Sequence, residues 1–297
     1  MTTKPVGLLS PGDMGHSVGR VLIENGMPVV TCLKGRSERT RKLAEATGIK
    51  DMGTYEKLVR ETDIILSILV PAEAESAAGM VAEAISIIDS QIVYVDCNAV
   101  SPKTVQAIGK IIEDAGSHFV DAGIIGPPPR EPGVTRFYAS GSEASRFAAL
   151  NAYGLDIRVI GQNIGQASGL KMTYAALTKG SFAIAIELLV AAWRMGLYAP
   201  LKEEFLMSQA QLYTHLENSL PKIPPKSRRW IGEMEEIAKT FQDLDMTPKI
   251  YQGAADIYRF MGKSPLADET PETLDENRSL EEMIRILAEN TEGVSKE

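Results

Sequence analysis

Three side chains near the middle of the chain combine one basic group with two hydroxyls. Lys171, Tyr174 and Thr178 are spaced i, i+3 and i+7, so a helix places them on one face. A lysine whose pKa is lowered by burial can exchange a proton with a substrate near neutral pH. One interpretation of this face is a general acid/base at Lys171, with Tyr174 and Thr178 as substrate contacts. Composition alone favours the simpler interpretation, in which Lys171 extends to the surface and the Tyr174 hydroxyl is hydrated.

A second group of residues, near the N-terminus, is suited to a phosphate. The apolar run Val6–Leu9 is followed by a turn and then by a helical pattern. A strand, a glycine turn and a helix N-terminus bind pyrophosphate in dinucleotide-binding domains, with the fingerprint G-x-G-x-x-G. The predicted cofactor-binding residues of this turn are Ser10, Pro11, Gly12, Asp13, Met14 and Gly15. Ser10 replaces the first glycine, and alone the match is weak because similar turns begin helices that bind nothing. We expect the Asp13 side chain to point away from the phosphates.

A basic turn follows the second strand pattern and bears on the choice of cofactor. Sites that prefer NAD usually carry Asp or Glu about 20 residues beyond the fingerprint, where it binds the ribose 2′-hydroxyl. This chain has Lys34, Arg36 and Ser37 there and no acid. Because arginine binds phosphate through forked donors, the turn favours NADP over NAD. The alternative is a solvated turn in which Ser37 caps a helix.

A third loop is expected to face the cofactor. The buried strand pattern Asp63–Leu69 runs into Val70 and Pro71, and proline ends a strand. Ligands of open α/β sheets bind at the carboxyl ends of the strands. We therefore expect Leu69, Val70 and Pro71 to contact the cofactor, with plain core packing as the alternative for Leu69 and Val70.

Alternating strand and helix patterns must position these residues. The strand patterns are Val6–Leu9, Pro28–Leu33, Asp63–Leu69, Ile92–Asp96, His118–Ile125, Thr135–Ala139 and Ile157–Ile160. The helical patterns between them are Met14–Asn25, Ser37–Thr47, Ala72–Ile88 and Ser101–Ala115. The alternation predicts an α/β fold, a Rossmann-type doubly wound sheet. Ser101 and Pro102 form a typical helix start.

The second half of the chain contains helical patterns only. A long helix is predicted from Gly165 to about Leu197, apolar on nearly all sides between Phe182 and Trp193. The later helical patterns are Leu201–Leu216, Ser227–Leu244, Pro248–Gly262 and Ser279–Glu289. We therefore predict a Rossmann domain over residues 1–163, an all-α C-terminal domain over 164–290, and a frayed tail over 291–297. A helix apolar on all sides needs a partner, which predicts a homodimer through the helical domain.

The composition limits the classes of partner. The chain has 297 residues, a net charge of −8 and a pI near 5.2, which argue against binding nucleic acid or an anionic membrane. The sequence shows no run near the roughly 20 apolar residues of a membrane span. The three histidines lack metal-ligand spacing, so no metal site is predicted. Two cysteines and an N-terminus unlike a signal peptide favour buried thiols in the cytoplasm.

Four segments in order resemble the β-hydroxyacid dehydrogenase superfamily, which includes 3-hydroxyisobutyrate and 6-phosphogluconate dehydrogenases. They are Gly7–Gly15, Asp96–Pro102, Val120–Gly126 and Gly165–Thr178. The likeness is closest to the phosphogluconate-dehydrogenase-like NAD(P)-dependent oxidoreductases with a divergent C-terminal domain. The resemblance implies that Lys171 is the general acid/base, and that Asn98 serves substrate and cofactor. It further implies substrate contacts at Ala99, Ile125 and Gly126.

The departures from the family pattern concern the substrate. Ala175 stands where the family has asparagine, Asn98-Ala99 replaces paired hydroxyl residues, and Ile125-Gly126-Pro127 replaces Ser-Gly-Gly. These changes remove hydrogen-bond donors for a small carboxylate, which favours a larger or less polar small-molecule substrate. The expected activity is NADP-dependent hydride transfer to or from a β-hydroxy acid or related alcohol or carbonyl compound. The alternatives are an imine reductase, in which the lysine is typically replaced, and a catalytically silent NADPH-binding sensor.

Overall fold

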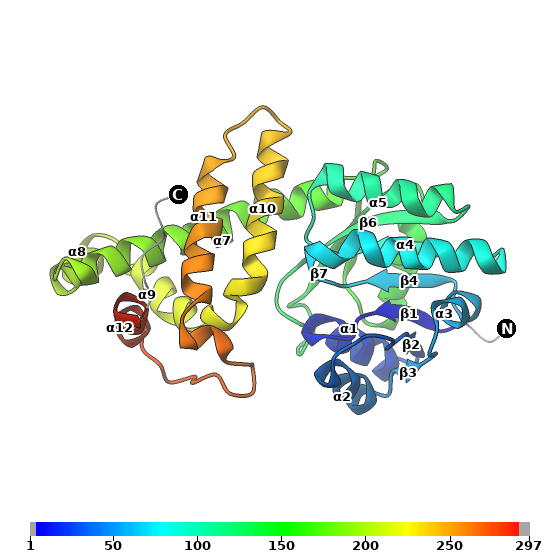
Figure 1. Ribbon diagram of the computed structural model, residues 1–297, viewed down its shortest axis with the longest axis horizontal. Helices are drawn as coiled ribbons and strands as arrows, with labels where there is room; N and C mark the ends of the chain where they lie inside the picture. Colours follow the sequence, from blue (N-terminus) through cyan, green and yellow to red (C-terminus); the bar gives the residue numbers. More distant parts are fainter. Residues whose placement is uncertain (1–3, 291–297) are drawn as a thin grey trace. The chain divides into compact units, whose positions relative to one another are not determined.

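An eight-stranded sheet forms the first part of the chain (Figure 1). The computed structural model describes residues 4–290. The strands are β1 (Val6–Leu9), β2 (Val29–Thr31), β3 (Lys50–Asp51), β4 (Ile64–Ser67), β5 (Val93–Asp96), β6 (His118–Ile125), β7 (Arg136–Ser140) and β8 (Ile157–Gly161). Their order is β3-β2-β1-β4-β5-β6-β7-β8, and neighbours are parallel except β6 and β7. The predicted doubly wound fold is confirmed.

Helices connect these strands. They are α1 (Asp13–Glu24), α2 (Glu38–Thr47), α3 (Tyr55–Glu61), α4 (Pro71–Ile88), α5 (Pro102–Asp114) and α6 (Ala144–Ala148), which a 3-10 helix follows (Ala149–Tyr153). The predicted cap at Ser101 is confirmed, because its hydroxyl accepts the backbone N–H of Thr104. The sequence patterns missed β3, α3 and α6, which are all short. Strands β1, β4, β5 and β6 are parallel neighbours, so their carboxyl ends lie at one edge of the sheet.

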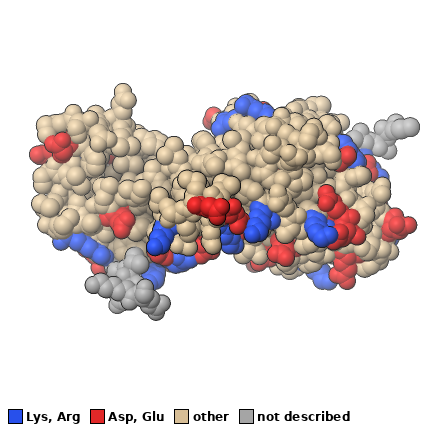
Figure 2. All heavy atoms as spheres, turned by 90° about the horizontal axis from the view of Figure 1, so that it is seen from above, with Lys and Arg blue, Asp and Glu red and all other residues tan. Residues whose placement is uncertain are grey.

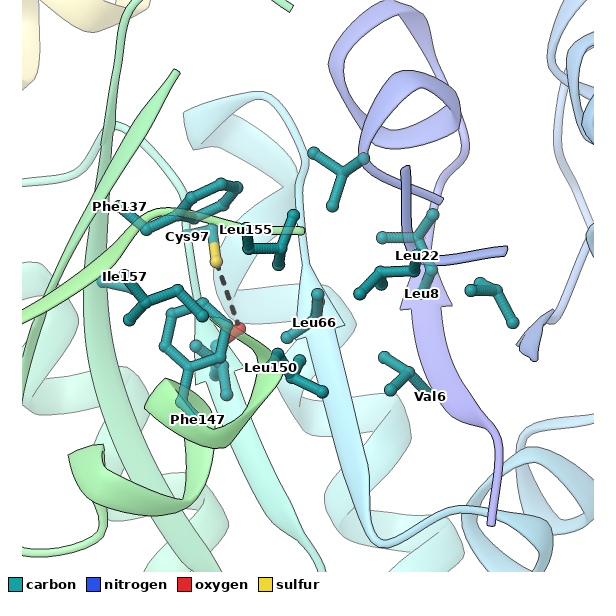
Figure 3. Packing of buried hydrophobic residues seen from close by; sticks show 14 of the residues in the cluster. Val6, Leu8, Leu22, Leu66, Cys97, Phe137, Phe147, Leu150, Leu155 and Ile157 are labelled. Atoms are coloured by element: carbon teal, nitrogen blue, oxygen red, sulfur yellow. Dashed lines mark hydrogen bonds between the residues drawn. The ribbon is translucent and has the colours of Figure 1, made fainter. Parts of the chain in front are cut away.

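Apolar side chains fill both faces of the sheet. Figure 3 shows one face, where Leu8 of β1 and Leu66 of β4 lie in a cluster with Phe137 and Phe147. Cys97 belongs to the same cluster, and its thiol lies 4.0 Å from the carbonyl oxygen of Val95. On the other face the rings of Tyr94 and Phe119 are stacked, 6.0 Å apart. Both cysteines, Cys32 and Cys97, are buried and free, as predicted.

The second compact unit is helical. Contacts divide the chain between Met172 and Thr173, inside helix α7 (Gln166–Arg194), whereas the sequence patterns place the boundary near residue 163. Helices α8 (Tyr198–Ser208), α9 (Ala210–Ser219), α10 (Ser227–Gln242), α11 (Lys249–Gly262) and α12 (Leu280–Asn290) follow, with 3-10 turns at Leu220–Lys222, Pro224–Lys226 and Pro265–Asp268. The single helix predicted over Leu201–Leu216 is wrong: Gln209, at φ −143°, separates α8 from α9. The predicted frayed tail lies outside the described residues.

Helix α7 is the element on which two further predictions depend. Among the described helices it has the length and apolar content of a membrane span, with a mean hydropathy of 1.6 over its best window. Half of that window is buried within the structure, as in the core helices of globular proteins, so the finding is weak evidence for a span. Leu177 and Ile184 are 75% and 56% exposed. The homodimer and the absence of membrane binding stay predictions.

Charged side chains of both signs mix on the surface. On the face drawn in Figure 2, lysine and arginine lie among aspartate and glutamate, and the described residues of that face form no continuous basic area.

Candidate active site

The turn between β1 and α1 has the shape of a dinucleotide-binding turn. Ser10, at the place of the first glycine, has φ +59°, in the left-handed region that favours glycine. A Cβ atom on Gly15 would lie 2.6 Å from the carbonyl oxygen of Ser10, so only glycine lets α1 approach β1 this closely. A Cβ on Gly12 would meet no atom within 4 Å. Gly15 is therefore packed tightly against the end of β1, whereas there is free space beside Gly12.

The N-terminus of α1 carries no side-chain cap. Gly12 is the N-cap residue, and no side-chain hydrogen bond caps the helix. The first-turn N–H groups of a helix attract anions when side chains leave them uncapped. Asp13 adds a negative charge there, and its carboxylate lies 3.6 Å from the guanidinium of Arg130 in the loop between β6 and β7. This end of α1 fits a pyrophosphate group bound by backbone donors.

The basic turn after β2 presents one arginine with unused donor capacity. Gly35, at φ +74°, allows the Arg36 N–H to reach the carbonyl oxygen of Leu33 at 3.1 Å. Burial raises the pKa of Tyr55, and the adjacent Arg36 acts in the opposite direction. The Arg36 Nε is buried and has no hydrogen-bond partner in the described part of the chain. An unpaired buried donor fits a phosphate ligand.

The neighbours of Arg36 divide between two roles. The Ser37 hydroxyl accepts the backbone N–H of Thr40 at 3.2 Å and so caps α2, which is the local structure that the alternative interpretation expected. Lys34 is exposed. Arg36 and Lys34 are therefore the available cations of the turn.

Asn98 joins the carboxyl ends of β4 and β5. Its amide nitrogen donates to Ser67 Oγ at 3.0 Å and to Asp96 Oδ2 at 2.9 Å, and its oxygen accepts the Leu69 N–H at 2.5 Å. The Asn98 backbone N–H also donates to Asp96 Oδ1 at 2.9 Å. Both amide hydrogens are thus engaged within the chain. Asn98 lies where predicted, but its contribution is to fix the loop that begins at Leu69.

Asp121 binds the start of α7. Its carboxylate is fully buried and accepts the backbone N–H groups of Gly165, Ala167 and Ser168 at 2.9, 3.0 and 3.1 Å. It also accepts the hydroxyls of Ser140 at 3.0 Å and Ser168 at 2.6 Å. A carboxylate at a helix N-terminus is stabilised by the helix dipole and by the free N–H donors. Asp121 therefore fixes the start of α7 against β6.

Lys171 lies one turn farther along α7. A Cβ atom on Gly123 of β6 would be 3.0 Å from the Lys171 Cβ, so glycine at this position lets the lysine backbone approach the sheet. Lys171 acts electrostatically on Asp96 and Cys97 at the end of β5. Burial raises the pKa of Asp96 to about 7, while the Asn98 hydrogen bonds and the Lys171 charge act to lower it. A lysine and a titrating carboxyl group thus share the carboxyl edge of the sheet.

The remaining predicted residues differ in what they present. Ala99 and Ile125 are buried, and Gly126, at φ +116°, is packed against the carbonyl oxygen of Val134, so all three shape the loops. Val70, 42% exposed, precedes Pro71 at the start of α4. Tyr174 and Thr178 follow on α7, in the helical unit. Tyr174 is 51% exposed, and the Thr178 hydroxyl donates to the backbone carbonyl oxygen of Tyr174 at 3.3 Å.

Four residues of the site were not predicted: Asp96, Asp121, Ser140 and Ser168. The available signal was a lone acid at the end of one strongly apolar strand pattern, and another inside the next. Among residues 4–290, no group of three or more His, Cys, Asp or Glu side chains forms a possible metal site.

Known proteins share this architecture. The NAD binding domain of 6-phosphogluconate dehydrogenase matches residues 5–152, and a domain of unknown function, DUF1932, matches residues 192–261. An uncharacterized 28.5 kDa protein of Methanothermus fervidus is 32% identical over 82% of this chain and 93% of its own length.

Solved structures agree with these matches. A conserved protein of unknown function, described as structurally similar to 3-hydroxyacid dehydrogenases, is 30% identical with a TM-score of 0.64, over 87% of this chain and 99% of that one. The 3-hydroxyisobutyrate dehydrogenase of Mycobacterium tuberculosis shares the fold at 17% identity and a TM-score of 0.67, over 96% and 98% of the two chains. Imine reductases share it as well. The chain belongs to the family of proteins with the NAD binding domain of 6-phosphogluconate dehydrogenase, here joined to a DUF1932 domain, and it shares the fold of 3-hydroxyisobutyrate dehydrogenase.

Proposed function

We propose that this protein is an NADP-dependent oxidoreductase that transfers a hydride between the nicotinamide and a β-hydroxy acid or related alcohol or carbonyl substrate. The observation that carries the proposal is the placement of Lys171. Asp121 and Gly123 of β6 hold it at the carboxyl edge of the sheet. The open glycine turn after β1 lies at the same edge.

The chain's own groups are suited to the cofactor. The uncapped N-terminus of α1 offers backbone donors to the pyrophosphate, and the open position at Gly12 leaves room for it. The unpaired Arg36 Nε and the exposed Lys34 offer donors to a 2′-phosphate, which supports NADP over NAD. Val70 offers an exposed apolar surface at the end of β4. When bound, the cofactor supplies the carbon that accepts or gives the hydride.

Lys171 supplies the proton chemistry in this proposal. Oxidation of an alcohol requires removal of the hydroxyl proton, which the neutral amine of Lys171 accepts on Nζ. Reduction of a carbonyl group requires the reverse, so the Lys171 ammonium donates its proton to the forming alkoxide. Asp121 keeps Lys171 in place by binding the first turn of α7. The family asparagine has no counterpart at Ala175, which is buried.

The loop after β6 supports a substrate of low polarity. Ile125 and Gly126 offer no side-chain hydroxyl, and the three prolines of residues 127–129 lack backbone N–H donors. Arg130 is a cation of the same loop, and its guanidinium lies beside the Asp13 carboxylate. A substrate larger and less polar than a short hydroxy acid suits these residues better.

Nicotinamide absorbance in a stopped-flow instrument tests the proposal. The purified chain is mixed with NADPH or NADP⁺ and a panel of hydroxy acids, apolar alcohols, aldehydes, ketones and cyclic imines. Turnover with an alcohol or carbonyl compound, faster with NADP(H) than with NAD(H), is the expected result. Turnover confined to imines identifies an imine reductase, and tight NADPH binding without any turnover identifies a sensor; either result overturns the proposal.

A further inference from the structure

Four buried polar side chains form a row across the sheet. Ser67 of β4 is in register with Asp96 of β5, Asp96 with Asp121 of β6, and Asp121 with Ser140 of β7. Each of the four is 0% exposed. Polar side chains in an otherwise apolar sheet are costly unless they are paired. We therefore expect these four side chains to have a functional or structural role that apolar residues could not fill.

The two acids of the row differ in how their charges are compensated. Asp121 accepts five hydrogen bonds, four of them from Gly165, Ala167 and Ser168 in the first turn of α7 and its approach. Asp96 accepts two, and both come from Asn98. Donors to a carboxylate stabilise its ionised form. Asp96 therefore has the fewer donors of the two acids, and burial raises its pKa to about 7.

Among the charged groups that act on Asp96, Lys171 is the cation. Asp121 faces it from β6 and raises its pKa, while Lys171 faces it from α7 and lowers it. Ser67 faces it from β4 and carries no charge. On β5 and directly after it, burial raises the pKa of Tyr94 and Cys97 well above their usual values, so both stay neutral near pH 7. The charge of Asp96 near pH 7 is thus felt mainly by Lys171 and Asp121.

We propose that Asp96 is a positioning residue that acts through Lys171, its carboxylate keeping the lysine protonated and ready to donate. The proposal rests on the proposed function, in which Lys171 exchanges the proton of the reaction. Coupling between two titrating groups is reciprocal, so a carboxylate stabilised by the ammonium stabilises the ammonium equally. Asp96 touches neither substrate nor cofactor in this scheme. Its hydrogen bonds to Asn98 additionally tie its ionisation to the loop at Leu69.

Competitive labelling of amines tests the proposal without any turnover. The chain reacts with a trace of acetic anhydride between pH 6 and 11, and the modification of Lys171 is followed by mass spectrometry against the exposed Lys42. Asp96→Asn is expected to lower the pKa of Lys171 by about one unit, since a nearby negative charge is lost. Ser67→Ala is the matched control: it removes a hydrogen bond to Asn98 and no charge, and it should leave the pKa of Lys171 within about 0.3 units of its original value. An unchanged Lys171 titration in Asp96→Asn, or an equal shift in Ser67→Ala, overturns the proposal.

A second variant keeps the test valid if Asp96→Asn does not fold. In Lys171→Met the carboxyl carbon of Asp96 is followed by ¹³C NMR across pH 5 to 9. The pKa of Asp96 is expected to rise relative to the unchanged chain, and an unaltered titration contradicts the coupling. Because neither measurement requires a substrate, a shift without hydroxy acid turnover would refute the proposed function alone, and turnover without a shift would refute this inference alone.

Discussion

Two regions of the candidate site differ in whether their polar groups are hydrogen-bonded within the chain. At the β1–α1 turn and the basic turn, donors are left open: α1 has no side-chain cap, and the Arg36 Nε has no partner among the described residues. Inside β6 and just after β5, the buried Asp121 and Asn98 are extensively hydrogen-bonded within the chain. Open donors are suited to bind a ligand, and engaged ones hold a structure in place. On this difference we propose that the first region binds the ligand and that the second positions the groups of the site.

The largest expected effect is at Asp121. Asp121→Asn replaces the charge that three backbone N–H groups and two hydroxyls share. We expect a loss of about 3–5 kcal/mol in the free energy of unfolding, typical of a broken buried charged network, measured by urea denaturation. Asp13→Asn, at a partly exposed acid on α1, is the control and should cost less than about 1 kcal/mol. Equal losses in the two variants would remove the distinction between the regions.

The stability of the chain should depend on pH through Asp96. Its pKa is about 7 in the folded chain and 3.8 as the ordinary value, so the folded state binds the extra proton between these limits. The free energy of unfolding should therefore fall as pH rises from about 4 to about 7, by at most about 4 kcal/mol, and level off above that range. In Asp96→Asn this slope should disappear. Urea denaturation at several pH values measures it, and a slope that persists in the variant contradicts the assignment.

At the open end, Arg36 should affect binding and leave stability nearly unchanged. Arg36→Glu is expected to weaken NADPH binding about 100-fold and NADH binding much less, because a repelled 2′-phosphate is present only in NADPH. Fluorescence titration with both cofactors measures the ratio. Arg39→Glu makes the same charge change on an exposed arginine of α2 and is the control. Equal weakening for the two cofactors would refute the preference for NADP.

The smallest expected effect concerns Ser10. Ser10→Gly removes the cost of a left-handed φ of +59° but adds flexibility to the unfolded chain. We expect a net gain of about 0.5–1 kcal/mol in unfolding free energy, visible as a slightly higher Tm. Ser10→Ala keeps the backbone strain and should show no gain. A stabilised alanine variant would mean that the serine side chain, rather than its φ, is unfavourable.

The sequence predicted the elements whose signals are local. β1 and β6 have the predicted bounds because each is an apolar run that a turn interrupts, and α5 starts where Ser101 and Pro102 place it. The edge strand β3 was missed because two exposed, polar residues carry no pattern. The helix break at Gln209 was not predicted because neither glycine nor proline occurs there.

The sequence suggested the candidate ligand-binding residues but not the buried acids that support them. Lys171 and the glycine turn could be singled out because they belong to motifs with fixed spacing. Asp96 and Asp121 act through partners that lie far away in the sequence, such as Ser168, 47 positions from Asp121. The left-handed Ser10 was likewise beyond prediction, because serine rarely adopts that conformation.

The central claim is that Lys171 exchanges the proton of a nicotinamide-dependent reaction. Lys171→Met removes the amine, and Lys171→Arg keeps the positive charge while losing proton exchange near neutral pH. The decisive measurement is single-turnover nicotinamide absorbance for both variants, alongside NADPH binding by fluorescence. We predict that both bind NADPH within about threefold of the unchanged chain and turn over at least about 1,000-fold more slowly. Substantial turnover in Lys171→Met, with NADPH binding intact, would contradict the account.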